Sequence, residues 1–192
     1  MGTELAIAGI GGTLRQGSYS GFLLKNSSRL MPAGSRLEVI DLTGIPLFNQ
    51  DKVGIPDGTV KKFKDDIAVA DGVLFVTPEY NYSIPGVLKN AIDVASFPAQ
   101  DSPFRGKPAG IMSSSTGIFG GMRAQYHLRQ VLVYLQMHVM PAPEFFLDRA
   151  NSKFDDKGNL TDEESKKRIS KFLVLFTEYV RKFTVTEPKH SQ

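Results

Sequence analysis

The sequence contains no cysteine among its 192 residues. This absence excludes disulfide bonds, thiolate nucleophiles, thiolate zinc sites and Fe–S clusters together. Any redox chemistry in this chain would therefore need a bound organic cofactor.

Long apolar runs and blocks of one charge are missing as well. No stretch approaches the roughly 18 consecutive apolar residues that a membrane-spanning helix needs, so we expect no membrane insertion. The 23 basic and 20 acidic residues alternate along the chain and give a formal net charge of only +3, which argues against a nucleic-acid partner. The start, Met1-Gly2-Thr3-Glu4, lacks the basic segment and apolar core of a secretory signal, so we expect a cytoplasmic protein.

The three histidines do not have the spacing of metal ligands, and we predict no metal site. His127 falls in a predicted helix, His138 opens a predicted strand and His190 lies near the end of the chain. A hydrolase is also disfavoured, because the hydroxyl cluster at 113–116 lacks the first glycine of a nucleophile elbow.

What the sequence does contain is an alternation of short apolar runs with helical patterns. The runs at 5–10, 37–40, 72–77, 109–112 and 138–140 are each typical of a buried strand. Parallel strands need a crossover between neighbours, so this alternation predicts a parallel sheet with helices on both faces. We expect one α/β domain over 1–192, a three-layer sandwich whose five strands take the order 2-1-3-4-5.

The last helical segment is the clearest in the chain. Thr161 ahead of Glu164 predicts a capping box at its start. Periodicity is lost from 184 to 192, and we expect this tail to fray. The apolar stripe of the helix consists of Ile169, Phe172, Leu173, Phe176, Val180 and Phe183.

The loop after the first strand predicts a phosphate site. It runs Gly11-Gly12-Thr13-Leu14-Arg15-Gln16-Gly17-Ser18-Tyr19-Ser20 into a helix. The glycines allow a tight turn, the helix N-terminus favours an anion, and Thr13, Ser18 and Ser20 offer hydroxyl donors. Arg15 supplies a positive charge. The alternative is an ordinary Gly/Ser turn with a helix cap and a solvated Arg15.

This loop matches neither of two common nucleotide motifs. Leu14 stands where the third glycine of the dinucleotide fingerprint belongs, and Ser18 stands where a P-loop requires lysine. ATP and a Rossmann-type NAD site are therefore disfavoured.

Two further loops are expected at the same place, because ligands of open α/β sheets bind at the carboxyl ends of strands where strand order reverses. The loop after the third strand, 77–86, offers aromatic faces, amides and a proline-fixed backbone. The loop after the fourth strand, 113–121, offers small hydroxyls and glycine N–H groups. A phosphate pocket beside a pocket for a planar ring predicts a mononucleotide.

These motifs resemble the NADPH-dependent FMN reductase family, in particular its quinone and chromate reductase branch. The resemblance rests on 12–18, 78–93 and 120–130, and it extends from Leu5 to Phe183. It implies a flavodoxin-like fold, FMN as cofactor and NAD(P)H as co-substrate. It also implies that the phosphate is held by Thr13, Arg15 and Ser18, and the ribityl chain and ring by Pro78, Glu79, Tyr80, Asn81, Ser115, Thr116 and Gly117. Gly12, Leu14 and Ser20 complete the predicted cofactor-binding residues.

The sequence departs from the pattern of this family at four positions. Thr13 and Ser20 replace a common Ser and Asn but keep a hydrogen-bonding group. Val94 and Phe97 replace a common Trp and Arg, and we expect both near the mouth of the site, where they would affect the choice of acceptor.

In such an enzyme the cofactor carries the redox chemistry, so no side chain is predicted to act as a catalytic acid or base. Quinones, flavins, azo dyes and chromate are all candidate acceptors, and the choice between NADH and NADPH is open. The alternative is an electron-carrier flavodoxin, which does not oxidise a nucleotide itself. Arg15 in the first loop and the net charge of +3 favour the reductase.

The helix around 122–134 predicts an oligomer, because its apolar residues cover more of its circumference than one core-facing stripe requires. These residues are Tyr126, Leu128, Val131, Val133 and Tyr134. The family resemblance implies a homodimer, often paired into a homotetramer. Arg123 and Glu144 could form contacts across the subunit boundary, with a solvated rim as the alternative.

Overall fold

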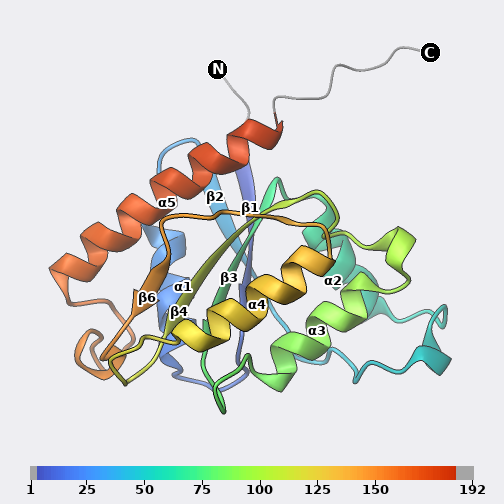
Figure 1. Ribbon diagram of the computed structural model, residues 1–192, viewed down its shortest axis with the longest axis horizontal. Coiled ribbons are helices and arrows are strands. Elements are labelled where there is room, and N and C mark those ends of the chain that lie inside the picture. Colours follow the sequence, from blue (N-terminus) through green and yellow to red (C-terminus); the bar gives the residue numbers. More distant parts are fainter. Residues whose placement is uncertain (1–3, 185–192) are drawn as a thin grey trace.

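Residues 4–184 are described by the computed structural model, and they form a parallel sheet between two layers of helices (Figure 1). The sheet order is β2-β1-β3-β4-β5, and every pair is parallel. This confirms the predicted flavodoxin-like order. The strands are β1 (Leu5–Gly11), β2 (Ser35–Ile40), β3 (Gly72–Pro78), β4 (Pro108–Ser114) and β5 (His138–Val139).

A sixth strand, β6 (Phe145–Leu147), was not predicted from the sequence. It pairs with Met112–Ser114 of β4, whereas β5 pairs only with Pro108 and Ala109 of that strand. The position beside β4 is therefore shared by two short strands. The five predicted strands are all present in the predicted order, and the three-residue β6 is an addition to them.

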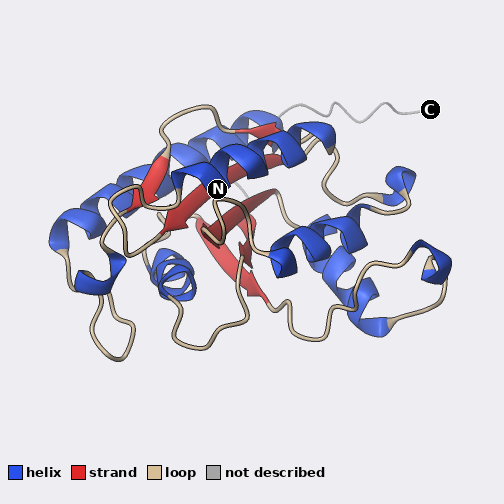
Figure 2. Cartoon of the chain, turned by 60° about the horizontal axis from the view of Figure 1, so that its bottom comes forward, coloured by secondary structure: helices blue, strands red, loops and turns tan. Residues whose placement is uncertain are grey.

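The helices are divided between the two faces of the sheet (Figures 1 and 2). One face carries α1 (Tyr19–Arg29) and α5 (Glu163–Thr184), and the other carries α2 (Gly58–Ala68), α3 (Gly86–Ser96) and α4 (Met122–Tyr134). Short 3₁₀ turns lie at Gln50–Lys52, Ala99–Asp101 and Ala150–Ser152. Between residues 4 and 184, no helix has the length and apolarity that crossing a bilayer requires.

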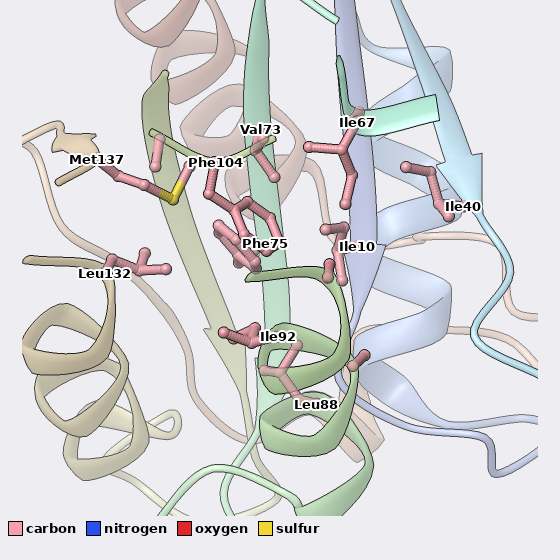
Figure 3. Packing of buried hydrophobic residues seen from close by; sticks show 14 of the residues in the cluster. Ile10, Ile40, Ile67, Val73, Phe75, Leu88, Ile92, Phe104, Leu132 and Met137 are labelled. Atoms are coloured by element: carbon pink, nitrogen blue, oxygen red, sulfur yellow. The ribbon is translucent and has the colours of Figure 1, made fainter. Parts of the chain in front are cut away.

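β3 shows why both faces need a layer of helices. Val73 and Phe75 pack under α2, α3 and α4, as Figure 3 shows, while Leu74 and Val76 pack under α1 and α5. All four side chains are fully buried. Burying one such side chain stabilises the fold by about 1.5–3 kcal/mol, so an uncovered face would expose a continuous apolar surface.

The start of α5 differs from the predicted capping box. Asp162 caps the helix: its Oδ1 accepts from the backbone N–H of Ser165 at 2.9 Å, and its carbonyl accepts from Lys166. Thr161 instead donates its hydroxyl to the carbonyl of Lys153. Asp and Thr both favour the cap position, so two adjacent candidates could not be separated by sequence.

The two hydrogen bonds from Ser165 hold the pKa of Asp162 below its ordinary value. At the other end, α5 includes Thr184, where fraying was expected to begin. The rest of that tail lies outside the described residues.

A buried amide joins α1 to the segment that precedes α5. Asn26 is only 7% exposed. Its Nδ2 donates to the carbonyls of Phe22 and Gly158, both at 2.8 Å, and its Oδ1 accepts from the N–H of Leu160 at 3.1 Å. Because α1 begins at the glycine-rich loop, this contact helps to fix the helix that positions the loop.

Asn26→Ala should lower the free energy of unfolding by about 2–4 kcal/mol, because it strands buried backbone groups of Gly158 and Leu160 without partners. Urea denaturation would measure the loss. The matched control is Ser28→Ala on the same helix, whose hydroxyl bonds only the exposed carbonyl of Lys25. The control should stay within about 0.5 kcal/mol of the parent. Equal losses in both variants would show that the amide has no special role.

Candidate functional site

Three loops leave the carboxyl ends of β1, β3 and β4 at one edge of the sheet, the lower edge in Figure 1, which comes forward in Figure 2. The first two are held together directly. The N–H of Gly12 donates to the carbonyl of Val76 at 2.8 Å, and the Thr13 hydroxyl lies 3.3 Å from the Tyr80 hydroxyl. A Cβ on Gly12 would lie 2.7 Å from Thr77 Oγ1, so only glycine allows this approach.

The first loop ends at Ser18, which is the N-cap of α1. Its Oγ accepts from the N–H of Gly21 at 3.1 Å. A hydroxyl that accepts one hydrogen bond still has its own hydrogen to donate, so the cap and the predicted phosphate contact are compatible. Ser20, in the first turn of α1, is buried, and its hydroxyl has no partner among the described residues.

The charge in this loop comes from Arg15, which is exposed. Within residues 4–184, the arginines that pair with a carboxylate are Arg36, Arg123, Arg129 and Arg149, and Arg15 is not among them. A cavity of about 520 Å³ lies beside the loop. Its lining includes Thr13, Leu14, Arg15 and Ser18 from the loop, Lys25 from α1, and Asp41 and Thr43 from the segment after β2.

The second loop contains a tight two-residue turn. Tyr80 and Ser83 exchange backbone hydrogen bonds of 2.9 Å, and the residues between them, Asn81 and Tyr82, have φ of 51° and 62°. This is the left-handed pair of a type I′ turn, which is uncommon for tyrosine. The Tyr82 side chain is left 66% exposed. His127 Nδ1 lies 2.9 Å from Ser83 Oγ and holds the turn against α4.

The carboxylate of Glu79 has a different role from the one its position in the motif suggested. Its Oε2 accepts from the backbone N–H groups of Arg123 at 3.0 Å and Ala124 at 3.4 Å, and its Oε1 accepts from Arg123 Nη1 at 3.0 Å. The carboxylate is thus committed to the start of α4.

The third loop is anchored by the unpredicted strand β6 and the residues that follow it. The N–H of Ser115 donates to the carbonyl of Leu147 in β6, and its carbonyl accepts from Ala150. The carbonyl of Gly117 accepts from Arg149 at 3.1 Å. Thr116 and Gly117 are exposed. The hydroxyl of Ser114, just before the loop, is buried without a partner among the described residues.

Together the three loops present hydroxyls, backbone N–H groups and one unpaired cation beside a set of exposed apolar side chains. These apolar side chains are Leu14, Tyr80, Tyr82, Ile118 and Phe119. Such a surface can hold an anion at the start of α1 and a flat ring across the ends of β3 and β4.

Val94 and Phe97 lie outside these three loops. They line a second cavity of about 510 Å³ between 46–57 and the ends of α2 and α3. The Phe97 ring contacts the Phe48 ring at a centroid distance of 5.5 Å. Its carbonyl accepts from Lys64 Nζ at 2.7 Å, and burial there lowers the pKa of Lys64.

The histidines of the described part have neighbours that are not metal ligands. His138 stacks on Phe183 at a centroid distance of 4.5 Å, and His127 contacts Ser83. His190 lies outside the described residues. No three acidic or histidine side chains within 4–184 gather as metal ligands would.

Comparison with known proteins places these loops in a recognised family. The family model described as NADPH-dependent FMN reductase matches residues 5–152, which include all three loops. An NAD(P)H-dependent FMN reductase of Pseudomonas aeruginosa is 45% identical over 184 residues, covering 95% of this chain and 98% of that protein. A quinone reductase of Escherichia coli K12 is 38% identical over 190 residues, covering 96% and 100%.

Among solved structures, the flavoenzyme FerB of Paracoccus denitrificans, an NAD(P)H:(acceptor) oxidoreductase, superimposes with a TM-score of 0.86. The two sequences are 31% identical, and the match covers 93% of this chain and 98% of FerB.

Proposed function

Because the chain belongs to the NADPH-dependent FMN reductase family, and is thus an oxidoreductase with FMN as cofactor and NAD(P)H as co-substrate, we propose that the three loops hold the flavin and that quinones are its acceptors. The observation that carries this proposal is the convergence of the three loops at one sheet edge. Quinone is the acceptor named for relatives from Escherichia coli and Pseudomonas putida. Flavins, azo dyes and chromate stay predictions of the sequence analysis.

The residues present fit the phosphate of FMN. The buried Ser20 hydroxyl lacks a partner, the Ser18 hydroxyl keeps a hydrogen to donate, and Arg15 has no carboxylate. Desolvating a hydroxyl without a partner costs about 1–3 kcal/mol, so a phosphate oxygen near α1 would offset a cost already present. Thr13 stabilises the turn of the first loop, since its Oγ1 accepts from the N–H of Arg15 at 3.1 Å.

The ring would lie against the second and third loops. Pro78, Tyr80 and Asn81 would contribute backbone groups and an aromatic face, and Ser115–Gly117 would contribute small polar groups. When bound, FMN supplies the redox chemistry, accepting hydride from NAD(P)H and passing two electrons to the acceptor. The protein binds, orients and excludes water, with no side chain proposed as a catalytic acid or base.

The purified protein should be yellow, and acid or heat should release FMN and not FAD, identifiable by chromatography.

With no added partner protein, it should oxidise NADH or NADPH in the presence of a quinone. The acceptor panel should include flavin, an azo dye and chromate. Bound FMN without turnover would favour the electron-carrier flavodoxin, and a colourless protein that does not bind added FMN would contradict the assignment.

Arg15→Ala should raise the dissociation constant for FMN about tenfold to a hundredfold, because charge-assisted hydrogen bonds to anions are worth roughly 1.5–3 kcal/mol. Fluorescence titration of the apoprotein would measure it. Arg36→Ala is the control, since Arg36 pairs with Glu4 and Glu38 near the opposite edge of the sheet. An unchanged constant in Arg15→Ala would place the phosphate elsewhere.

We also propose that the chain is a homodimer or homotetramer through the outer face of α4. Of the five apolar residues considered for this face, Leu128 and Val131 pack into the core. Tyr126, Val133 and Tyr134 are exposed, and Tyr134 is 84% exposed. These three form a smaller face than the sequence analysis suggested.

Arg123 and Glu144, expected at the subunit boundary, both have partners within the chain. Arg123 pairs with Glu79. Glu144 lies 3.7 Å from Arg129 and 3.4 Å from the Tyr126 hydroxyl. Their contacts across a boundary stay a prediction.

Light scattering at micromolar concentration should give at least twice the 21.1 kDa chain mass. Tyr134→Asp should shift the mass toward the monomer, because it places a charge on the proposed interface at each of its symmetric copies. Val174→Asp, on an exposed position of α5, should leave the mass unchanged. A monomeric parent protein would exclude the proposed interface.

A further inference from the structure

Glu79 and Arg123 join the end of β3 to the start of α4 across 44 positions of sequence. The guanidinium of Arg123 does more than pair with the carboxylate. Its Cζ lies 4.0 Å from the centroid of the Tyr82 ring, in the second loop, and 4.9 Å from that of Phe119, in the third. One cation therefore contacts an aromatic ring of each loop and the Glu79 carboxylate of the second loop.

The start of α4 cannot be capped by its own N-cap residue. That residue is Gly121, with φ of 86° and no side chain to accept a hydrogen bond. A Cβ there would lie 2.9 Å from Ser113 Cβ, so the fold excludes the usual capping residues from this position. The N–H groups of Arg123 and Ala124 must find an acceptor elsewhere, and Glu79 supplies it together with the negative charge that a helix N-terminus favours.

The ion pair of Glu79 and Arg123 is partly shielded from solvent, so the loss of either charge should affect the loops around it. The Glu79 side chain is 12% exposed and that of Arg123 is 35% exposed. Exposed ion pairs contribute little to stability, but removing one partner of a largely buried pair leaves an uncompensated charge. The second and third loops would then lose a charged contact that joins them, and only contacts such as that of His127 with Ser83 would still hold the second loop to α4.

We infer that Glu79 and Arg123 are positioning residues, a clamp that holds the second and third loops as one rigid wall of the flavin site and thereby sets the affinity for the acceptor. This inference rests on the proposed function. Two of the exposed aromatic residues of this wall, Tyr82 and Phe119, are both contacted by Arg123. Without the clamp, the acceptor must order two loops as it binds. That cost weakens binding before reaction and in the transition state alike, so KM rises while kcat stays the same.

The decisive experiment is a double-mutant cycle of Glu79→Gln and Arg123→Met, with KM and kcat measured for a quinone. Each single variant should raise KM about tenfold, the effect of one charge-assisted hydrogen bond, with kcat within about twofold of the parent. The double variant should be no worse than the poorer single variant, because the two residues act together. Effects that multiply, or an unchanged KM, would overturn the clamp.

Two further variants separate positioning from a general loss of structure. Arg123→Lys keeps the charge for Glu79 but loses the flat guanidinium, so it should restore only part of the parent KM. Arg36→Met removes a paired arginine from β2 and should leave KM unchanged. All variants should keep the parent mass by light scattering. If KM changed only in variants whose oligomer mass also changed, the effect would come from subunit contacts, and the inference that Glu79 and Arg123 form a clamp would be wrong.

Hydrogen exchange on the apoprotein tests the clamp without the flavin. Glu79→Gln and Arg123→Met should each speed exchange in both 78–83 and 115–124, and the amides of Arg123 and Ala124 should respond most to Glu79→Gln. Faster exchange in only one of the two segments, or in neither, would overturn the inference. If the parent bound no FMN, the proposed function would fail, while this measurement would still decide whether the two loops are coupled.

Discussion

The parallel pairing of β1 with β3 is the constraint on which the site depends. The register sets Gly11, the last residue of β1, beside Val76, two residues before the end of β3. The N–H of Gly12, the first residue after β1, still donates to the carbonyl of Val76. The two loops therefore begin in contact. A side chain at Gly12 would collide with Thr77, so a glycine at this position follows from the strand pairing as well as from any ligand.

The same strands that form the core also supply the polar groups at its edge. β3 and β4 are apolar along most of their length but carry Thr77, Ser113 and Ser114 close to their carboxyl ends, all three buried. Ser113 donates to the carbonyl of Gly120 and accepts from Gln125 Nε2, so it fixes the third loop and α4. The Ser114 hydroxyl has no such partner within the described residues. Because these strand ends are buried, the side chains packed around the hydroxyl groups restrict their rotation and keep them in fixed positions.

Much of this arrangement could be predicted because it depends on local patterns. Five strands, the sheet order and the three loops follow from apolar runs, helical spacing and the chirality of crossovers. What could not be predicted depends on partners distant in sequence. β6 was not predicted, and it is defined by its pairing with β4, which is distant in sequence. Thr161 and Asp162 are equivalent as caps by residue type, and only contacts with Lys153 and Ser165 separate them.

Glu79 shows the same limit within the site itself. A carboxylate in a loop that faces a ligand is expected to serve that ligand, and no local feature of the sequence indicates otherwise. Its role is set by Gly121, far along the chain, where the close approach to Ser113 requires glycine and so removes the local cap of α4. A helix end that lacks its own cap needs an acceptor from another segment. Here the acceptor is Glu79, which lies in the neighbouring loop at the same edge of the sheet. A residue of a binding motif can therefore serve to cap a helix of the fold and need not contact the ligand through its side chain.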